Sequence, residues 1–251
     1  SALLRSCPIC SGSTTPILEI AELSDGFTFI NQNLYPIVAP AAQTPPNPPG
    51  PEGLAGTTVG AHFLQWTSSR HSDDWPELGQ ADRMVCMKRL AHLERRLLDL
   101  QGLPEPVSAL GVDGGYYVSI IKNVGRTVGG SLSHGHQQIA FTSVAPRRVA
   151  DNIGFQQRTG QRFADFMYRN NPTHLTVAEL DRGRLMVPYF MRRPYDMVYV
   201  PVPVDEAAVA RTAGRPDSAK GLLSELDGPA LQELANALAL GMRALRGVLV
   251  S

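Results

Sequence analysis

The stretch Ser131-Leu132-Ser133-His134-Gly135-His136-Gln137-Gln138 follows a glycine-rich run from Gly125 to Gly130. Side chains at positions i, i+2 and i+4 of a strand project from one face, so His134, His136 and Gln138 are expected to converge on one point. Two imidazoles and a carboxamide on one face suit either a metal ion or a phosphate group. The stretch therefore predicts a β-strand that carries a functional site.

The glycine-rich run favours phosphate chemistry for this site. Backbone N–H groups approach phosphate oxygens closely only where no Cβ intervenes, and Gly125, Gly129 and Gly130 provide that freedom. The Ser131 hydroxyl and the Asn123 amide add further hydrogen-bond donors. An isolated His-x-His is more often part of a glycine-rich surface hairpin, but these flanking donors favour a catalytic centre for phosphate chemistry.

Apolar patterns around the motif predict an α+β fold. Tyr116 to Lys122 and His136 to Val144 are β-branched-rich runs joined by glycines, which is typical of paired strands. Upstream, Leu78 to Leu100 shows helical spacing, so we expect a helix that begins near Pro76 and ends near Gly102. Three further strands are expected before this helix, at Phe27 to Asn31, Leu34 to Ala39 and Ala61 to Thr67.

The second half of the chain repeats part of this order. A helix is expected from Val149 to Tyr168, then strands at Leu175 to Leu180, Leu185 to Phe190 and Asp196 to Val202, and a helix from Pro229 to Val248. Because Leu185-Met186-Val187-Pro188 echoes Tyr35-Pro36-Ile37-Val38, an internal duplication is predicted. The expected domains are residues 1–147 and 148–251, the second lacking the strands that would carry another histidine pair.

Composition narrows the functional classes. The 251 residues carry no formal net charge, which argues against bulk binding to nucleic acid or to a membrane surface. No apolar run reaches the roughly 20 residues that cross a bilayer, and Ser1 to Ser6 lack a signal pattern. The three cysteines, two of them spaced as Cys7-x-x-Cys10, favour a metal or redox role over a secreted scaffold. A cytoplasmic protein is expected.

Several motifs together resemble the galactose-1-phosphate uridylyltransferase branch of the histidine triad (HIT) superfamily. The resemblance covers about residues 7 to 203. Its motifs, in order, are Cys7-x-x-Cys10, Phe29-Ile30-Asn31, Ser69-Arg70-His71-Ser72 ahead of Pro76-Glu77-Leu78, Asn123-Val124-Gly125, Gly129-Gly130-Ser131, His134-x-His136-x-Gln138, Val187-Pro188-Tyr189 and Arg193-Pro194-Tyr195. The implied fold is α+β, with tandem HIT-like repeats in an antiparallel half-barrel, helices packed on one side and the second repeat incomplete. The resemblance also implies a homodimer.

The resemblance implies a nucleotidyltransferase that acts on nucleotide sugars and sugar phosphates. His136 would attack the α-phosphorus and form a covalent nucleotidyl-histidine, since imidazole has a reference pKa of about 6.5 and leaves readily afterwards. A backbone carbonyl would hold its other ring nitrogen as a donor. Gln138 would hydrogen-bond a non-bridging oxygen of the phosphate. Asn31, Asn123, Gly129, Gly130 and Ser131 would contact the substrate.

The resemblance implies a structural zinc ion on Cys7, Cys10, His71 and His134. Two thiolates and two imidazoles close a tetrahedral shell and leave no position for a catalytic water. Unliganded thiols or a redox pair are the alternative interpretation of Cys-x-x-Cys. The other histidines His62, His92 and His174 have no motif around them, and the first two are expected to be structural or exposed.

The sequence also departs from the family pattern. Asn31-Gln32 stands where relatives carry an Asn-Asp pair near the nucleoside, and only six residues precede Cys7. Base and sugar specificity therefore stay open. Two alternatives remain beside the uridylyltransferase-like activity: a phosphorylase that splits ADP-sugars or dinucleoside polyphosphates with inorganic phosphate, and a non-catalytic nucleotide-binding member.

Overall fold

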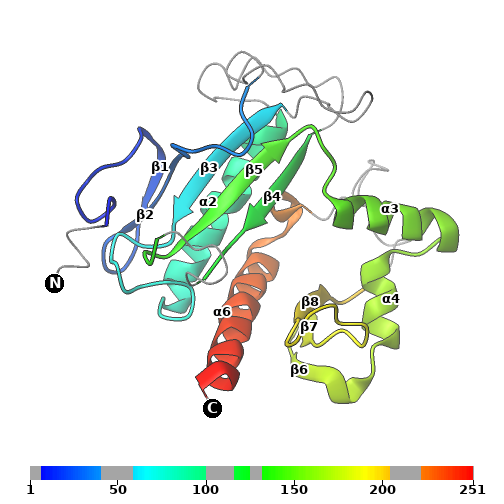
Figure 1. The fold of residues 1–251 in the computed structure, drawn as a ribbon. Coiled ribbons are helices and arrows are strands. Elements are labelled where there is room, and N and C mark those ends of the chain that lie inside the picture. The colour runs from blue at the N-terminus through cyan, green and yellow to red at the C-terminus, as the bar shows by residue number, and fades with distance from the viewer. Residues whose placement is uncertain (1–6, 41–58, 100–115, 125–131, 204–221, 251) are drawn as a thin grey trace. The chain divides into compact units, whose positions relative to one another are not determined.

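The protein has a mixed α+β fold with two antiparallel sheets (Figure 1). The structure, a computed structural model, describes residues 7–40, 59–99, 116–124, 132–203 and 222–250. Contacts divide the chain into two compact units, Ser1–Pro146 and Arg147–Ser251. The interpretation of these units as tandem repeats stays a prediction. None of the helices in the described ranges has the length and apolar character that a membrane span requires.

The first unit is built around a five-stranded antiparallel sheet. Its strand order is β1-β2-β3-β5-β4, so the two strands nearest the motif, β4 and β5, form one side of the sheet. The strands are β1 (Ile17–Glu22), β2 (Phe27–Gln32), β3 (Gly60–Trp66), β4 (Tyr117–Ile121) and β5 (His136–Thr142). The central pair β3 and β5 runs in register from Gly60 opposite Thr142 to Trp66 opposite His136.

One face of this sheet is covered by the helix α2 (Gln80–Asp99), as Figure 1 shows. The helix turns a stripe of apolar side chains toward the sheet because they recur every three or four residues. Its buried apolar residues are Cys86, Met87, Leu90, Ala91, Leu93 and Leu97. They form the core with Phe63, Ile139 and Phe141, none of which is more than 1% exposed. Burial of each such large side chain contributes roughly 1.5–3 kcal/mol.

Gln137 is a polar residue within this core, and it anchors β5 to the helix side of the sheet. Its Oε1 accepts hydrogen bonds from Trp75 Nε1 at 3.1 Å and from Thr67 Oγ1 at 3.2 Å. Its Nε2 donates to Gln65 Oε1, and Gln65 in turn donates to the Cys86 carbonyl of α2 at 2.9 Å. Because side chains alternate along a strand, this anchoring directs His136 and Gln138 to the opposite face.

The described part of the second unit contains a three-stranded antiparallel sheet in the order β6-β7-β8, together with α-helices and short 3₁₀ turns. Met167, Met186 and Val200 form its buried cluster. The elements are α3 (Arg147–Thr159), α4 (Phe163–Asn170), η4 (Thr173–Leu175), β6 (Thr176–Glu179), β7 (Gly183–Met186), β8 (Val198–Pro201), η6 (Leu223–Glu225) and α6 (Gly228–Val250).

Most predicted elements are present, but four predictions were wrong in detail. The strand expected at Leu185 to Phe190 is β7, which begins at Gly183 and ends at Met186. Leu34 to Ala39 is an irregular segment, since the Asn33 side chain accepts the Tyr35 N–H at 3.0 Å and closes a local turn. The expected helix from Val149 to Tyr168 is two helices, α3 and α4, because Gly160 adopts φ +72° between them. The helix expected at Pro76 begins at Gln80, and its expected end near Gly102 lies outside the described residues.

Candidate active site and metal centre

His136 is the first residue of β5, and its ring is held in one orientation. Its Nδ1 lies 2.8 Å from the His134 carbonyl oxygen. Because a carbonyl oxygen only accepts hydrogen bonds, Nδ1 carries the proton and Nε2 keeps the lone pair. The Trp66 ring packs against the imidazole, with ring centroids 5.0 Å apart. Nε2 is therefore the ring nitrogen that carries the lone pair, as the expected mechanism requires.

The surroundings of His136 favour its neutral form. The residue is only 8% exposed, and burial lowers the pKa of the imidazole below its usual value. The hydrogen bond to the His134 carbonyl and the negative charge of Asp74 raise the pKa, while the positive charge of Lys122 lowers it, and the effect of burial is the largest. A neutral imidazole is the form that attacks phosphorus.

Lys122 and Asp74 form a largely buried ion pair beside His136. Lys122 Nζ lies 2.9 Å from Asp74 Oδ2 and donates to the His136 carbonyl at 2.9 Å. The two side chains are 13% and 14% exposed. Gly135 packs against the carboxylate so closely that a Cβ there would lie 2.7 Å from Asp74 Cγ. The pair thus fixes the backbone on both sides of His136, and only glycine fits between His134 and His136.

The Lys122→Met variant is expected to lower the free energy of unfolding by about 2 kcal/mol, since it leaves the Asp74 carboxylate and the His136 carbonyl without their cation. Urea denaturation measures the difference. Lys88→Met, which removes an exposed lysine from α2, serves as the matched control and should change stability by less than about 0.5 kcal/mol. Equal effects of the two variants would contradict a structural role for the pair.

Gln138 lies on the same sheet face as His136. It is half-buried and pairs with Leu64 of β3 and Ile121 of β4, so it stands in the middle of that face. Asn123 follows β4 at the end of the sheet where His136 begins β5, and it is half-buried. The remaining predicted donors Gly129, Gly130 and Ser131 lie outside the described residues.

Asn31 was predicted to contact the substrate, but its side chain is buried and hydrogen-bonded within the protein. The residue is 3% exposed. Its Oδ1 accepts from Trp66 Nε1 at 3.0 Å, and its Nδ2 donates to Thr15 Oγ1 at 2.9 Å. Asn31 therefore fixes the indole that packs against His136. Its contact with a substrate stays a prediction.

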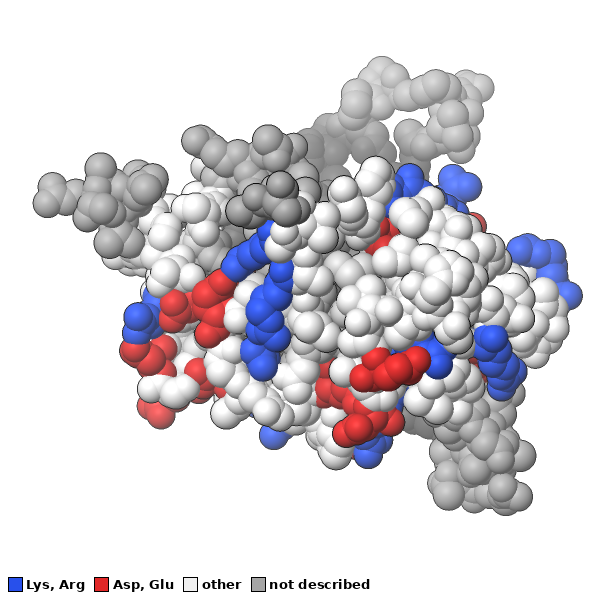
Figure 2. Space-filling view, turned by 90° about the horizontal axis from the view of Figure 1, so that it is seen from below, with Lys and Arg blue, Asp and Glu red and all other residues white. Residues whose placement is uncertain are grey.

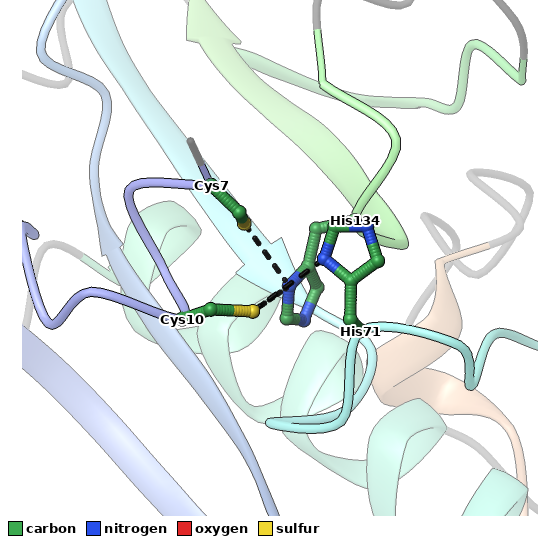
Figure 3. A group of neighbouring side chains, drawn as sticks. All are labelled: Cys7, Cys10, His71 and His134. Atoms are coloured by element: carbon green, nitrogen blue, oxygen red, sulfur yellow. Dashed lines mark hydrogen bonds between the residues drawn. The ribbon is translucent and has the colours of Figure 1, made fainter. Parts of the chain in front are cut away.

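The four predicted zinc ligands converge on one point, although they come from three separate segments (Figure 3). Cys7 and Cys10 belong to the N-terminal turn, His71 to the loop after β3 and His134 to the loop before β5. One ligand atom from each residue lies within 4.8 Å of all the others. His134 Nδ1 is 3.5 Å from Cys7 Sγ and 3.7 Å from Cys10 Sγ, and His71 Nδ1 is 3.5 Å from Cys10 Sγ.

These distances fit a tetrahedral zinc shell. With Zn–S near 2.3 Å and Zn–N near 2.0–2.1 Å, sulfur and nitrogen ligands on a tetrahedron lie about 3.6 Å apart. The outer ring nitrogens are also held: His134 Nε2 donates to the Ser68 carbonyl at 2.7 Å, and His71 Nε2 lies 3.0 Å from Ser133 Oγ. Such partners orient the imidazoles so that Nδ1 faces the metal. The four residues are a candidate metal site.

Three residues of the site were missed in the sequence: Trp66, Asp74 and Lys122. Trp66 lies between the two histidine rings, with centroids 5.5 Å from His134 and 5.0 Å from His136. Two signals were available, because Lys122 directly precedes Asn123 and Asp74 comes three residues after His71. Their pairing depends on how β4 meets the loop after β3, which the sequence does not show.

No protein-family model matches the sequence, and a comparison with curated proteins gives no match. Solved structures do match. A galt-like protein from Arabidopsis thaliana is 18% identical, with a TM-score of 0.67 over 95% of this chain and 69% of that chain. A uridylyltransferase structure is 19% identical, with a TM-score of 0.65 over 93% of this chain and 66% of that chain.

An ADP-glucose phosphorylase from Arabidopsis thaliana, solved with bound ADP-glucose, is also similar. It is 17% identical, with a TM-score of 0.71 over 98% of this chain and 71% of that chain. Likeness at these identities is a likeness of fold. The chain therefore shares the α+β fold of these solved structures, and a fold of this class is what its motifs predicted.

Proposed function

We propose that this protein is a nucleotidyltransferase that acts on a nucleoside diphosphate sugar through a covalent nucleotidyl-histidine on His136, most like a hexose-1-phosphate uridylyltransferase. The observation that carries the proposal is the hydrogen bond from His136 Nδ1 to the His134 carbonyl, which leaves the lone pair of the ring on Nε2. Gln138 supports it, because its amide lies on the same face two residues further along β5.

In the proposed first step, His136 Nε2 attacks the α-phosphorus of the donor. A P–N bond forms, the P–O bond to the sugar phosphate breaks, and the sugar phosphate leaves. The Gln138 amide donates a hydrogen bond to a non-bridging oxygen, where negative charge builds in the transition state. In the second step an acceptor phosphate oxygen attacks the same phosphorus, and the imidazole leaves with its lone pair restored.

Zinc would be structural in this scheme. Cys7, Cys10, His71 and His134 fill four positions, so the ion would offer no open position to a substrate. Its contribution would be to hold the N-terminal turn against the loop that carries His134. The His134 carbonyl accepts the hydrogen bond from His136 Nδ1. By holding His134 in place, the metal would therefore also hold the ring of the proposed nucleophile.

The second candidate is an ADP-sugar or dinucleoside polyphosphate phosphorylase. It shares the first step and differs in its acceptor, which is inorganic phosphate. The similarity of fold to the ADP-glucose phosphorylase with bound ADP-glucose, over 98% of this chain, supports this second candidate. A homodimer, a cytoplasmic location and the roles of Asn31, Asn123, Gly129, Gly130 and Ser131 in substrate binding belong to the same proposal. A non-catalytic nucleotide-binding protein is the remaining alternative.

Intact-protein mass spectrometry tests the proposal. The protein is incubated in turn with UDP-glucose, ADP-glucose and a diadenosine polyphosphate, and a UMP-sized or AMP-sized adduct is expected with one of them. The labelled protein is then mixed with galactose 1-phosphate or with inorganic phosphate. Loss of the adduct with the sugar phosphate supports the transferase, and loss with phosphate supports the phosphorylase. If no donor labels the protein, the catalytic proposal is wrong.

A further inference from the structure

His62 lies in β3 on the same sheet face as His136 and Gln138, and it is only 4% exposed. Its Nδ1 is 3.2 Å from the Ile37 backbone nitrogen and 3.1 Å from Asn33 Nδ2. A backbone N–H only donates, so Nδ1 must carry a lone pair. In the neutral imidazole the proton then lies on Nε2, and this nitrogen is a hydrogen-bond donor.

The Nε2–H of His62 is buried and has no hydrogen-bond partner among the described residues. A buried donor without a partner destabilises the folded protein, so a buried N–H of this kind calls for an explanation. Burial lowers the pKa of His62, whereas the nearby Gln138 side chain raises it. Gln138 is thus close enough to influence the ring, although it makes no hydrogen bond to Nε2 in the structure.

The sheet register explains why the side chains of His62 and Gln138 lie near each other. His62 pairs with Ala140, and Gln138 pairs with Leu64, so His62 and Gln138 are diagonal neighbours on the adjacent strands β3 and β5. Diagonal neighbours are within reach of long or ring side chains. Ala140 is small and leaves the space opposite His62 open for the ring to lean toward Gln138.

We propose that His62 is a positioning residue for Gln138: its Nε2–H donates to Gln138 Oε1 and thereby directs the Gln138 NH₂ group at the phosphate on His136. The inference rests on the function proposed above. A carboxamide has an accepting end and a donating end, and its terminal torsion is broad, so glutamine alone presents either end to a ligand. A fixed N–H donor on one side of the carboxamide pairs only with Oε1. The NH₂ group of Gln138 then points to the other side, where it donates to the phosphate oxygen.

Kinetic coupling between the two residues tests the proposal. The rate of His136 labelling is measured in single turnovers with whichever of UDP-glucose and ADP-glucose labels the wild-type protein. Gln138→Ala is expected to lower this rate about 100-fold, and His62→Phe about tenfold, since a fraction of amides still has the productive orientation. The donor concentration for half-maximal rate should change little. His62→Phe should have no further effect in the Gln138→Ala background.

Two further variants separate positioning from a general structural effect. His62→Gln retains a donor near the Nε2 position and should recover most of the rate. His92→Phe replaces a half-exposed histidine on α2 and should leave the rate unchanged. If His62→Phe slows labelling by the same factor with and without Gln138, His62 acts on the substrate or the fold by itself, and the proposal is overturned.

A readout that needs no activity keeps this inference distinct from the proposed function. Nitrogen-15 NMR of the histidine rings is expected to show His62 as the Nε2–H form, and Gln138→Ala should shift its Nε2 resonance while His92 stays in place. An unchanged His62 resonance in Gln138→Ala overturns the positioning role even where His136 is labelled. If the His62 resonance shifts but no donor labels His136, the contact between His62 and Gln138 is supported and only the proposed function is rejected.

Discussion

His136→Asn is expected to abolish nucleotidyl transfer, with the rate of adduct formation reduced by about four orders of magnitude or more. A carboxamide nitrogen has no lone pair comparable to that of imidazole Nε2, so no P–N bond forms at this position. The fold should survive the change. An asparagine N–H lies near the place of His136 Nδ1 and is able to donate to the His134 carbonyl, which now receives that bond at 2.8 Å.

Single-turnover mass spectrometry with the labelling donor measures this loss, and thermal unfolding checks that the variant is folded. His92→Asn is the matched control, because His92 lies on α2 and pairs with Glu19, away from the motif. An adduct that persists in His136→Asn would show that another residue is the nucleophile. Peptide mapping of that adduct would then identify it.

The sequence predicts the site best where the chemistry is local. His136 and Gln138 lie on one strand, and His134 comes just before it, so the period of two residues was enough to place His136 and Gln138 on one face. The predicted zinc ligands are different, because His71 and His134 lie 61 and 124 residues from Cys10. Spacing alone does not bring such distant segments together, and only the family resemblance linked them.

Strand predictions failed in two situations. One is an edge strand without a regular alternation of burial, and the other is a segment in which a side chain hydrogen-bonds the backbone in place of a neighbouring strand. β1 was missed because Ile17–Glu22 is an edge strand whose exposed and half-buried positions do not alternate regularly. Leu34 to Ala39 has a strand-like composition, but Asn33 and Pro36 favour a turn there. The secondary structure of such segments is determined by their neighbours in the fold and not by their own sequence pattern.

The supporting residues of the site were missed for a related reason. Lys122, Asp74, Trp66 and His62 act through partners that are set by strand register and loop packing. Nothing in the sequence near His62 distinguishes it from a core histidine. Its relation to Gln138 appears only once Ala140 is known to lie opposite it on β5.

The metal site carries the second large expected effect. Cys7→Ser is expected to lose bound zinc, about one ion per chain, and to lower the melting temperature by more than about 10 °C. Structural zinc contributes roughly 10–16 kcal/mol of apparent binding free energy in small zinc domains, and here it would join the N-terminal turn to two loops of the same unit. Elemental analysis and thermal unfolding measure both changes, and a strong chelator should reproduce them in the wild-type protein.

Cys86→Ser is the matched control, because Cys86 is a buried cysteine of α2 that donates to the Thr67 carbonyl and lies outside the cluster. It should retain the zinc. The rate of His136 labelling should fall in Cys7→Ser, since the His134 carbonyl that holds His136 Nδ1 belongs to a metal ligand. A folded Cys7→Ser protein with its zinc and its melting temperature unchanged would rule out the site, whereas lost zinc with an unchanged labelling rate would show that Asp74 and Lys122 alone fix the nucleophile.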